Sequence, residues 1–248
     1  MCLTCGCDEP ENGEKKGHFH SDGETHHHHH HSEGETIKVE RAILSENEKY
    51  AAYNRGFFDG KNIRCLNLIS SPGSGKTTLL EETLKKLISD KTPCAVIEGD
   101  QQTDRDAKRI EKTGAKAHQI NTGKACHLDA HQVQHALEHI KPESDSMLFI
   151  ENVGNLICPT EFNLGEHERV VVLSVTEGSD KPAKYPLAFR TATAVVISKL
   201  DLLPHVDFNM DETLKLIFGL NPSAKIFRLS AKTGDGMNDW LDWLKRKG

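Results

Sequence analysis

Residues 64–80 read RCLNLISSPGSGKTTLL, an apolar, β-rich run that leads through a glycine-rich loop into a helical pattern. Glycine has no Cβ, so Gly73 and Gly75 let backbone N–H groups turn inward around a phosphate, and the helix N-terminus adds partial positive charge. In such a loop Lys76 reaches the outer phosphates and the Thr77 hydroxyl binds Mg²⁺. The common pattern opens with glycine, whereas this chain has Ser70. We therefore expect a phosphate-binding loop (P-loop) formed by Ser71, Gly73, Ser74, Gly75, Lys76, Thr77 and Thr78.

Outward from this loop, short β-rich runs alternate with helical patterns over residues 61–248. Such alternation is typical of crossover units that build a mostly parallel sheet. The expected strands are 64–70, 94–99, 116–120, 147–153, 170–176, 194–198 and 225–229. The expected helices are 77–89, 103–112, 127–140, 210–219 and 237–247. The pattern predicts one α/β domain of the P-loop NTPase class, with a doubly wound, mostly parallel, seven-stranded sheet.

The composition argues against several classes of function. The 248 residues carry 31 Lys and Arg against 37 Asp and Glu, so the net charge is -6 and no dense basic face for nucleic acid is visible. The longest apolar runs, such as Ala192–Ile197, are far shorter than the roughly 20 residues that span a bilayer. Residues 1–7 have neither the basic start nor the apolar core of a secretory leader. We expect a cytoplasmic protein with reduced thiols that binds neither nucleic acid nor membrane.

A later segment bears on which base is bound. Ser198–Asp201, SKLD, follows an apolar run and is similar to the guanine-specificity motif Asn-Lys-x-Asp of GTPases, with serine in place of asparagine. In that motif the aspartate accepts hydrogen bonds from two guanine N–H groups, and the lysine stem covers the purine ring. Adenine offers no matching pair of donors, which favours GTP over ATP. A second segment resembles a GTPase motif that contacts the base edge through its backbone. The residues expected at the base are Lys199, Asp201, Ser230, Ala231 and Lys232.

Carboxylates close two other expected strands, at the edge of the sheet where open α/β folds bind ligands. Asp100 ends the second strand and is the candidate for holding Mg²⁺, directly or through water. Glu151 lies in the fourth and, with Gly154, takes the place of the Asp-x-x-Gly switch, whose glycine amide senses the γ-phosphate. Either carboxylate could instead cap a helix or lie in a solvated loop. The expected catalytic residues are Lys76, Thr77, Asp100 and Glu151.

Residues 1–36 nearly lack apolar side chains, so they cannot bury enough surface to offset the entropy of ordering. We expect a disordered tail, joined to the domain by an amphipathic helix at residues 37–60. Cys2, Cys5 and Cys7 can wrap one soft or borderline cation, either square-planar Ni²⁺ or tetrahedral Zn²⁺. Eight of the 15 histidines lie in residues 18–31, six of them consecutive. That run is either a metal reservoir or an expression tag.

A third group of metal-binding residue types falls inside the expected domain. Cys126 and His127 precede an expected helix, and Cys158 lies four residues after Gly154. Adjacent cysteine and histidine cannot close a compact site alone, so the pair needs another segment or a second copy across a dimer axis. If Cys158 completes the site, movement of the switch would couple nucleotide state to metal affinity. The alternative is a buried cysteine and a capping histidine, and the spacing alone does not decide between them.

Together these segments resemble the HypB family of hydrogenase nickel-incorporation GTPases over essentially the whole chain. The matching motifs are the CxxCGC start, the His-rich spacer, the helix containing residues 43–55, the loop SSPGSGKT, CHLDA at 126–130 and ENVGNL at 151–156. The resemblance implies a GTP-hydrolysing metallochaperone that delivers Ni²⁺ during assembly of the [NiFe]-hydrogenase active site. It also implies a homodimer promoted by GTP or metal, the partner HypA, and contact with the hydrogenase large subunit. The family's domain metal site falls on Cys126, His127 and Cys158, for Ni²⁺ or Zn²⁺.

Other functions fit part of the pattern. A nickel-storage protein would explain the tail without turnover. The related urease nickel GTPase also has a His-rich start, but the cysteine cluster and Cys126-His127 favour the hydrogenase branch. A P-loop kinase would need an acceptor pocket, for which the sequence gives no signal. Because no Gln or Arg stands out as positioning the attacking water, Mg²⁺-dependent hydrolysis of GTP to GDP and phosphate is expected to be slow.

Overall fold

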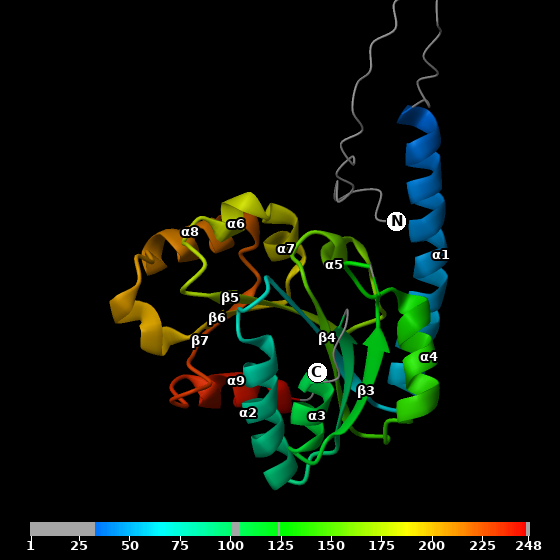
Figure 1. The fold of residues 1–248 in the computed structure, drawn as a ribbon, viewed down its shortest axis with the longest axis horizontal. Helices are drawn as coiled ribbons and strands as arrows, with labels where there is room; N and C mark the ends of the chain where they lie inside the picture. Colours follow the sequence, from blue (N-terminus) through cyan, green and yellow to red (C-terminus); the bar gives the residue numbers. More distant parts are fainter. Residues whose placement is uncertain (1–32, 101–104, 124, 247–248) are drawn as a thin grey trace, which may run out of the picture.

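The computed structural model describes residues 33–100, 105–123 and 125–246, and within them seven parallel strands form one sheet (Figure 1). The order across the sheet is β3-β2-β4-β1-β5-β6-β7. The strands are β1 (Arg64–Ser70), β2 (Cys94–Asp100), β3 (Lys116–Asn121), β4 (Met147–Gly154), β5 (Glu168–Ser174), β6 (Ala194–Ser198) and β7 (Lys225–Arg228). Every neighbouring pair is parallel. The predicted seven-stranded doubly wound sheet is confirmed.

Helices cover both faces of the sheet because the strands in the middle of the sheet carry apolar side chains on both faces. One face carries α2 (Lys76–Ser89), α3 (Arg105–Glu111) and α9 (Met237–Lys245), which bury a continuous core against β1, β2 and β4. The other face carries α1 (Glu33–Gly60) with α4 (Ala130–Ile140), and, over β5 and β6, α7 (Pro186–Thr191) with α8 (Met210–Leu220). The remaining helices are α5 (Cys158–Glu161), α6 (Lys181–Lys184) and the 3₁₀ helix η1 (Leu200–His205).

Helix α1 lies beside α4, and its N-terminal part extends past the domain (Figure 1). Two of its buried asparagines attach it to the domain. Asn54 Nδ2 donates to the carbonyl oxygens of Ala130 and Leu164, at 2.8 and 3.1 Å, and Asn47 Oδ1 accepts from the N–H of Ala130. Asparagines at these positions therefore fix the helix to the start of α4. None of the helices in the described ranges has the length and apolar run needed to cross a membrane.

Several element bounds differ from the expected ones. Helix α1 begins at Glu33, whereas residues up to 36 were expected in the tail, and the rest of that tail lies outside the described residues. Helix α4 begins at Ala130 and not at His127, because Asp129 caps it: its side chain accepts from Gln132 N, and Gln132 caps Asp129 in return. Helices α5, α6, α7 and η1 occupy stretches for which no helix was expected. They have four to six residues each, too few to show a helical period.

The order of the strands places the loops after β1 and β4 side by side. From β1 the chain crosses to β2 on one side, and from β4 it crosses back over β1 to β5. Ser70, at the end of β1, is in register with Gly154, at the end of β4. Open α/β sheets bind ligands at such a reversal of strand order. The fold therefore brings the glycine-rich loop and the segment leading to Cys158 to the same edge.

Candidate nucleotide and metal sites

The glycine-rich loop encloses its own lysine. Lys76 is the first residue of α2, and its Nζ donates to Ser70 Oγ at 3.0 Å. Burial lowers the pKa of Lys76, while the nearby carboxylates Glu151 and Glu98 act in the opposite direction. Gly75, at the N-cap, has φ of 94°, a left-handed conformation that favours glycine. Ser70, which replaces the usual glycine, thus supplies the hydroxyl that holds Lys76 in place.

A pocket of about 470 Å³ opens over this loop. The sequence-predicted residues that line it are Gly73, Ser74, Gly75, Lys76, Thr77, Thr78, Asp100, Glu151, Gly154 and Lys199. Ser71 lies next to the lining, where its Oγ accepts a hydrogen bond from Lys181 Nζ at 2.9 Å. The fold therefore gathers the ends of β1, β2, β4 and β6 around one cavity of the size that small-molecule ligands occupy.

Two buried carboxylates meet the loop inside this pocket. Thr77 Oγ1 donates to Glu151 Oε1 at 2.7 Å, and the Oε2 atoms of Glu151 and Glu98 are buried without a hydrogen-bond partner. Burial raises the pKa of Glu98 to about 8, with the charges of Glu151, Asp106 and Asp100 adding to the rise. Burial also raises the pKa of Glu151, although Lys76 and the Thr77 hydroxyl oppose it. Oxygen atoms left unsatisfied beside a hydroxyl suit a hard cation with oxygen ligands.

The expected base-binding segment is joined directly to the loop. Ser198 Oγ donates to the carbonyl oxygen of Ser74 at 2.7 Å, and Lys199 Nζ donates to that of Gly73 at 2.6 Å. Asp201 Oδ1 accepts from Ser230 Oγ at 2.6 Å, which ties the ends of β6 and β7 together. Asp201 and Ser230 are thus joined, with Ala231 and Lys232 following Ser230 in the chain, and none of these four residues lines the pocket. Ser198, which stands where the GTPase motif has asparagine, therefore holds the carbonyl group of Ser74 in the phosphate-binding loop.

Gly154 lies where β4 passes close to the loop. A Cβ at this position would come within 3.1 Å of the Cα of Pro72, tighter than ordinary van der Waals contact. The close approach explains why the position suits glycine. It also places the backbone of the expected switch against the phosphate-binding loop, four residues before Cys158.

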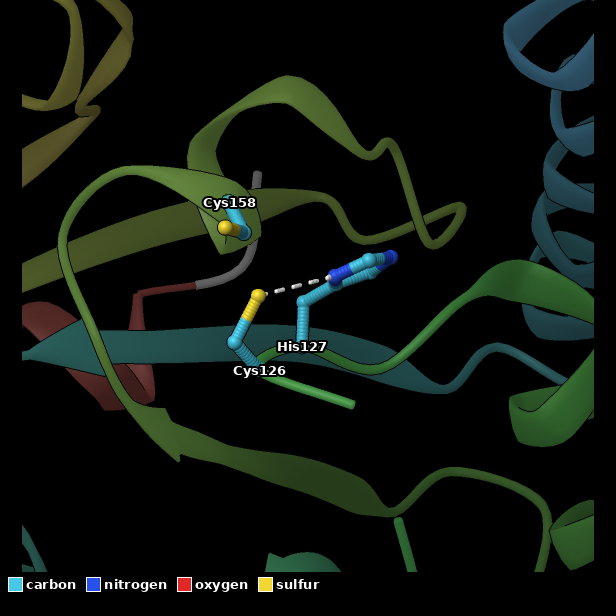
Figure 2. A group of neighbouring side chains, drawn as sticks. All are labelled: Cys126, His127 and Cys158. Atoms are coloured by element: carbon cyan, nitrogen blue, oxygen red, sulfur yellow. Dashed lines mark hydrogen bonds between the residues drawn. The ribbon is translucent and has the colours of Figure 1, made fainter. Parts of the chain in front are cut away.

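Cys126, His127 and Cys158 come together in space (Figure 2). Their ligand atoms all lie within 4.8 Å of one another, and Cys126 Sγ is 3.7 Å from His127 Nδ1. Donors bound to one tetrahedral ion at 2.0 to 2.3 Å lie about 3.3 to 3.8 Å apart, so side-chain movements of up to about 1 Å would close the site. Burial lowers the pKa of His127, which favours the neutral imidazole that binds metals. Two sulfurs and one nitrogen suit Ni²⁺ or Zn²⁺.

His127 is held against a second residue of the Cys158 segment. Its ring stacks on Phe162 with centroids 3.9 Å apart and planes inclined by 26°. Cys158 is fully buried as the first residue of α5, and Cys126 and His127 are half-buried. The three side chains therefore form a cluster. The alternative was an isolated buried cysteine and a histidine that caps a helix, but the residue that caps α4 is Asp129. Cys2, Cys5 and Cys7 lie outside the described residues.

Six residues of the pocket did not figure among the expected site residues: Pro72, Glu98, Gly99, Asp106, Arg109 and Asn152. Arg109 bonds Glu81 through Nη2 at 2.6 Å and Asp106 through Nη1 at 2.9 Å. The three-residue spacing of Asp106 and Arg109 puts both on one helix face and was the available signal. Asn152 Oδ1 accepts from the N–H of Leu128 at 3.2 Å, a contact between distant segments that no local pattern announces.

The fold and the phosphate loop define a P-loop nucleotide-binding protein, and residues 65–228 match the family of CobW/HypB/UreG nucleotide-binding domains. A hydrogenase maturation factor HypB from Azotobacter vinelandii is 48% identical over 238 residues, 96% of this chain and 78% of that protein. The hydrogenase/urease maturation factor HypB of Helicobacter pylori strain J99 is 43% identical over 215 residues, 85% of this chain and 88% of that protein.

A solved structure agrees with these relatives. The crystal structure of HypB from Helicobacter pylori in complex with nickel superposes with a TM-score of 0.76 at 42% identity, over 80% of this chain and 93% of that one. The chain belongs to the HypB family of hydrogenase maturation factors, and the family predicted from its motifs is confirmed.

Proposed function

We propose that this protein hydrolyses GTP and delivers Ni²⁺ during assembly of the [NiFe]-hydrogenase active site. The observation that carries the proposal is the short path between its two sites. Gly154 lines the nucleotide pocket, and Cys158, four residues further along the same segment, belongs to the cysteine–histidine cluster. A change at the γ-phosphate that moves Gly154 would change the geometry of the cluster, so nucleotide state and nickel affinity are linked.

Hydrolysis in this site is an in-line displacement. The oxygen of a water molecule attacks the γ-phosphorus, the bond from that phosphorus to the β–γ bridging oxygen breaks, and GDP leaves with phosphate as the second product. Lys76, buried beside the loop, neutralises charge on the β- and γ-phosphates. Lys76 then exchanges its hydrogen bond to Ser70 for the phosphate oxygens. The Gly154 backbone N–H meets the γ-phosphate, as the approach of β4 to Pro72 allows.

Thr77 and either Asp100 or Glu151 are the residues that would hold Mg²⁺. The hydroxyl of Thr77 already bonds a carboxylate, and Glu151 Oε2 is a buried oxygen without a hydrogen-bond partner. When bound, Mg²⁺ supplies positive charge to the phosphates. Arg109 lines the pocket but is engaged by Glu81 and Asp106, so it is not poised to stabilise the leaving group, and we expect slow turnover.

Nickel is the cargo of the proposed reaction. In our proposal Cys2, Cys5 and Cys7 capture Ni²⁺ in the tail, the histidine run holds a reserve, and Cys126, His127 and Cys158 bind Ni²⁺ or Zn²⁺ under nucleotide control. Thiolate ligands require a reducing compartment, which is why we place the protein in the cytoplasm. A homodimer promoted by GTP or metal would let a second copy complete the ligand set. The proposed recipients are the smaller maturation protein HypA and, directly or through it, the hydrogenase large subunit.

The proposed function is tested by two linked measurements. Purified full-length protein with GTP and Mg²⁺ should release phosphate without any cosubstrate, because water is the acceptor. In a strain that lacks this gene, the wild-type gene should restore hydrogenase activity at limiting nickel, whereas the variant Lys76→Ala should not. Phosphate release that requires an added acceptor would instead identify a kinase.

Asp201 should set the choice of base. In Asp201→Asn the amide N–H faces guanine donors, and the loss of two hydrogen bonds to a charged group, each worth about 1.5 to 3 kcal/mol, lowers kcat/KM for GTP at least about 100-fold. Xanthosine triphosphate, which presents a carbonyl there, should become the better substrate. The asparagine oxygen can still accept from Ser230 Oγ, so the fold is kept. The control is Asp207→Asn, an exposed aspartate nearby. Equal loss for both nucleotides would show that Asp201 does not contact the base.

Removal of residues 18–31 distinguishes delivery from storage. The deletion should cut the amount of Ni²⁺ bound per chain roughly in proportion to the histidines lost, because imidazoles bind borderline metals many at a time. Hydrogenase maturation at ample nickel should be unchanged if those histidines serve only as a reserve. Loss of maturation at ample nickel would show that the run takes part in delivery itself.

Urease maturation is a second candidate function, favoured by one observation. A relative from Helicobacter pylori carries the name hydrogenase/urease maturation factor. The hydrogenase and urease activities of the same deletion strain separate the two functions. If the protein also serves urease maturation, deletion of its gene lowers both the hydrogenase and the urease activity, and added nickel restores both.

A further inference from the structure

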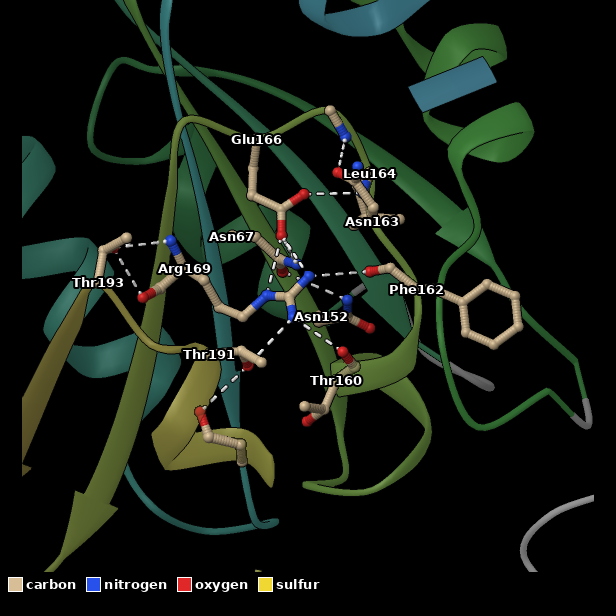
Figure 3. Close-up of polar contacts among 12 residues, drawn as sticks. Asn67, Asn152, Thr160, Phe162, Asn163, Leu164, Glu166, Arg169, Thr191 and Thr193 are labelled. Atoms are coloured by element: carbon tan, nitrogen blue, oxygen red, sulfur yellow. Dashed lines mark hydrogen bonds and ion pairs between the residues drawn. The ribbon is translucent and has the colours of Figure 1, made fainter. Parts of the chain in front are cut away.

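A buried polar network surrounds Arg169 and runs from Asn152 to the backbone of Thr160 and Phe162 (Figure 3). At its centre Arg169, in β5, forms an ion pair with Glu166, whose side chain is 5% exposed against 13% for the arginine. Arg169 Nε and Nη2 donate to Glu166 Oε1 at 3.0 and 2.8 Å. Burial of such a pair is costly unless every remaining donor and acceptor is satisfied, so the contacts of the other atoms show what the pair is for.

The remaining donors of the arginine reach the segment that carries Cys158. Arg169 Nη1 donates to the carbonyl oxygen of Thr160 at 2.8 Å, and Nη2 donates to that of Phe162 at 3.2 Å. These carbonyls lie at the C-terminal end of the four-residue helix that begins with Cys158. Phe162 in turn stacks on His127. One guanidinium thus fixes the backbone of the segment that carries Cys158 and of Phe162, the stacking partner of His127.

The carboxylate side of the pair leads to the nucleotide pocket. Glu166 Oε1 accepts from Asn67 Nδ2 at 3.3 Å, and Asn67 Oδ1 accepts from Asn152 Nδ2 at 3.3 Å. Asn152 lines the pocket, and its Oδ1 also accepts from the N–H of Leu128, the residue after His127. Asn67 is fully buried and Asn152 is 1% exposed, so water cannot replace these bonds without opening the core.

We propose that Arg169 is a positioning residue for the nickel site, and that the chain Arg169–Glu166–Asn67–Asn152 is the contact through which the occupied nucleotide pocket sets the geometry of Cys126, His127 and Cys158. This inference rests on the proposed nucleotide-coupled delivery of nickel and names the residues that couple the two sites. Movement of Asn152 when nucleotide binds affects both His127 and Cys158. It changes the bond to Leu128, next to His127, and, through Asn67 and Glu166, the orientation of the guanidinium that holds the Cys158 segment.

Arginine is needed at this position for its shape as well as its charge. Four oxygen atoms surround the guanidinium, from Glu166, Thr160, Phe162 and Thr191, and a planar fork bonds all of them without moving. Lysine keeps the charge beside Glu166 but has a single nitrogen, which cannot reach both carbonyls and the carboxylate together. The variant Arg169→Lys therefore removes the positioning function with little change in charge.

The test measures Ni²⁺ affinity by chelator competition in full-length protein in which Cys2, Cys5 and Cys7 are alanine, with GDP and with a non-hydrolysable GTP analogue. In Arg169→Lys we expect the affinity to fall about 10-fold or more, as for outer contacts of metal ligands, and the ratio between the two nucleotide states to approach 1. The KM and kcat for GTP should stay within about threefold. The matched control is Arg64→Lys, because Arg64 also joins a glutamate, Glu168, to backbone carbonyls, at the far end of β1.

Each outcome decides the inference. An unchanged affinity and ratio in Arg169→Lys overturns it, as does an equal change in Arg64→Lys, which would indicate general destabilisation. If Arg169→Lys does not fold, Asn67→Ser is measured instead and must reduce the ratio while leaving the GDP-state affinity near that of the parent. A ratio of 1 in the parent protein contradicts the nucleotide coupling in the proposed function, and Arg169 is then judged by the fall in affinity alone.

Discussion

The variant Lys76→Ala should lose GTP hydrolysis on the order of 10³-fold in kcat while it keeps nickel binding at the tail and at the cysteine–histidine cluster. The expected loss is large because a buried, preorganised cation faces the charge that develops on the phosphoryl group, and a single such donor is worth about 10² to 10³ in rate. Nickel binding should survive because Lys76 contacts Ser70 and not the cluster. Steady-state phosphate release and Ni²⁺ titration of the same preparation measure both.

Lys85→Ala is the matched control, since Lys85 lies on the same helix but is exposed and forms an ion pair with Glu82 one turn away. It should keep hydrolysis within about twofold, because an exposed i, i+3 pair contributes little. The fold of Lys76→Ala should persist, as Ser70 Oγ still donates to the carbonyl oxygen of Ser71. Simultaneous loss of hydrolysis and of all nickel binding in Lys76→Ala would contradict separate sites for nucleotide and metal.

The fold and the phosphate loop were predictable because their signals are local. The apolar strand 64–70, the glycines at 73 and 75 and the helix that begins at Lys76 lie within one stretch of chain, and their geometry follows from residue type. The start of α4 was not predicted correctly. A capping box at Asp129 and Gln132 stops the helix short of His127, which frees that imidazole to stack on Phe162. The two capping residues were the signal for the true start of the helix. The helical spacing of apolar residues instead led to a predicted start at His127, before the cap.

Contacts between distant segments could not be predicted in the same way. The cysteine–histidine cluster depends on the parallel pairing of β3 with β2 and of β2 with β4, which brings the segments after β3 and β4 to the same edge of the sheet, and spacing alone left Cys158 equally consistent with an ordinary core cysteine. Cys65 and Cys94, by contrast, were expected in strands and lie there, and burial raises the pKa of Cys94 to about 12. The network from Arg169 to Asn152 joins residues up to 99 positions apart through single hydrogen bonds. Hydrogen bonds between residues this far apart cannot be predicted from the periodicity of the sequence.

Cys126→Ala should abolish the nucleotide-dependent part of nickel binding. The variant removes one of two sulfur ligands, and since outer contacts of metal ligands already cost 10- to 100-fold, we expect the affinity of the cluster to fall by at least about 100-fold. The measurement is Ni²⁺ competition with a chelator, in GDP and in a non-hydrolysable GTP analogue, on full-length protein whose three tail cysteines are alanine. The parent should bind with different affinities in the two states, and Cys126→Ala should leave only the weak, state-independent binding of histidines.

Cys94→Ala is the thiol control for this measurement. Cys94 is half-buried on β2, and burial keeps it in the thiol form, so its removal should change neither affinity nor its dependence on nucleotide. Phosphate release should continue in Cys126→Ala, because Lys76 bonds Ser70 and Thr77 bonds Glu151 in the nucleotide pocket. Since Cys158 and Gly154 share one short segment, equal affinities in the parent with GDP and with the analogue would mean that movement at the γ-phosphate stops before Cys158. The two sites would then act independently.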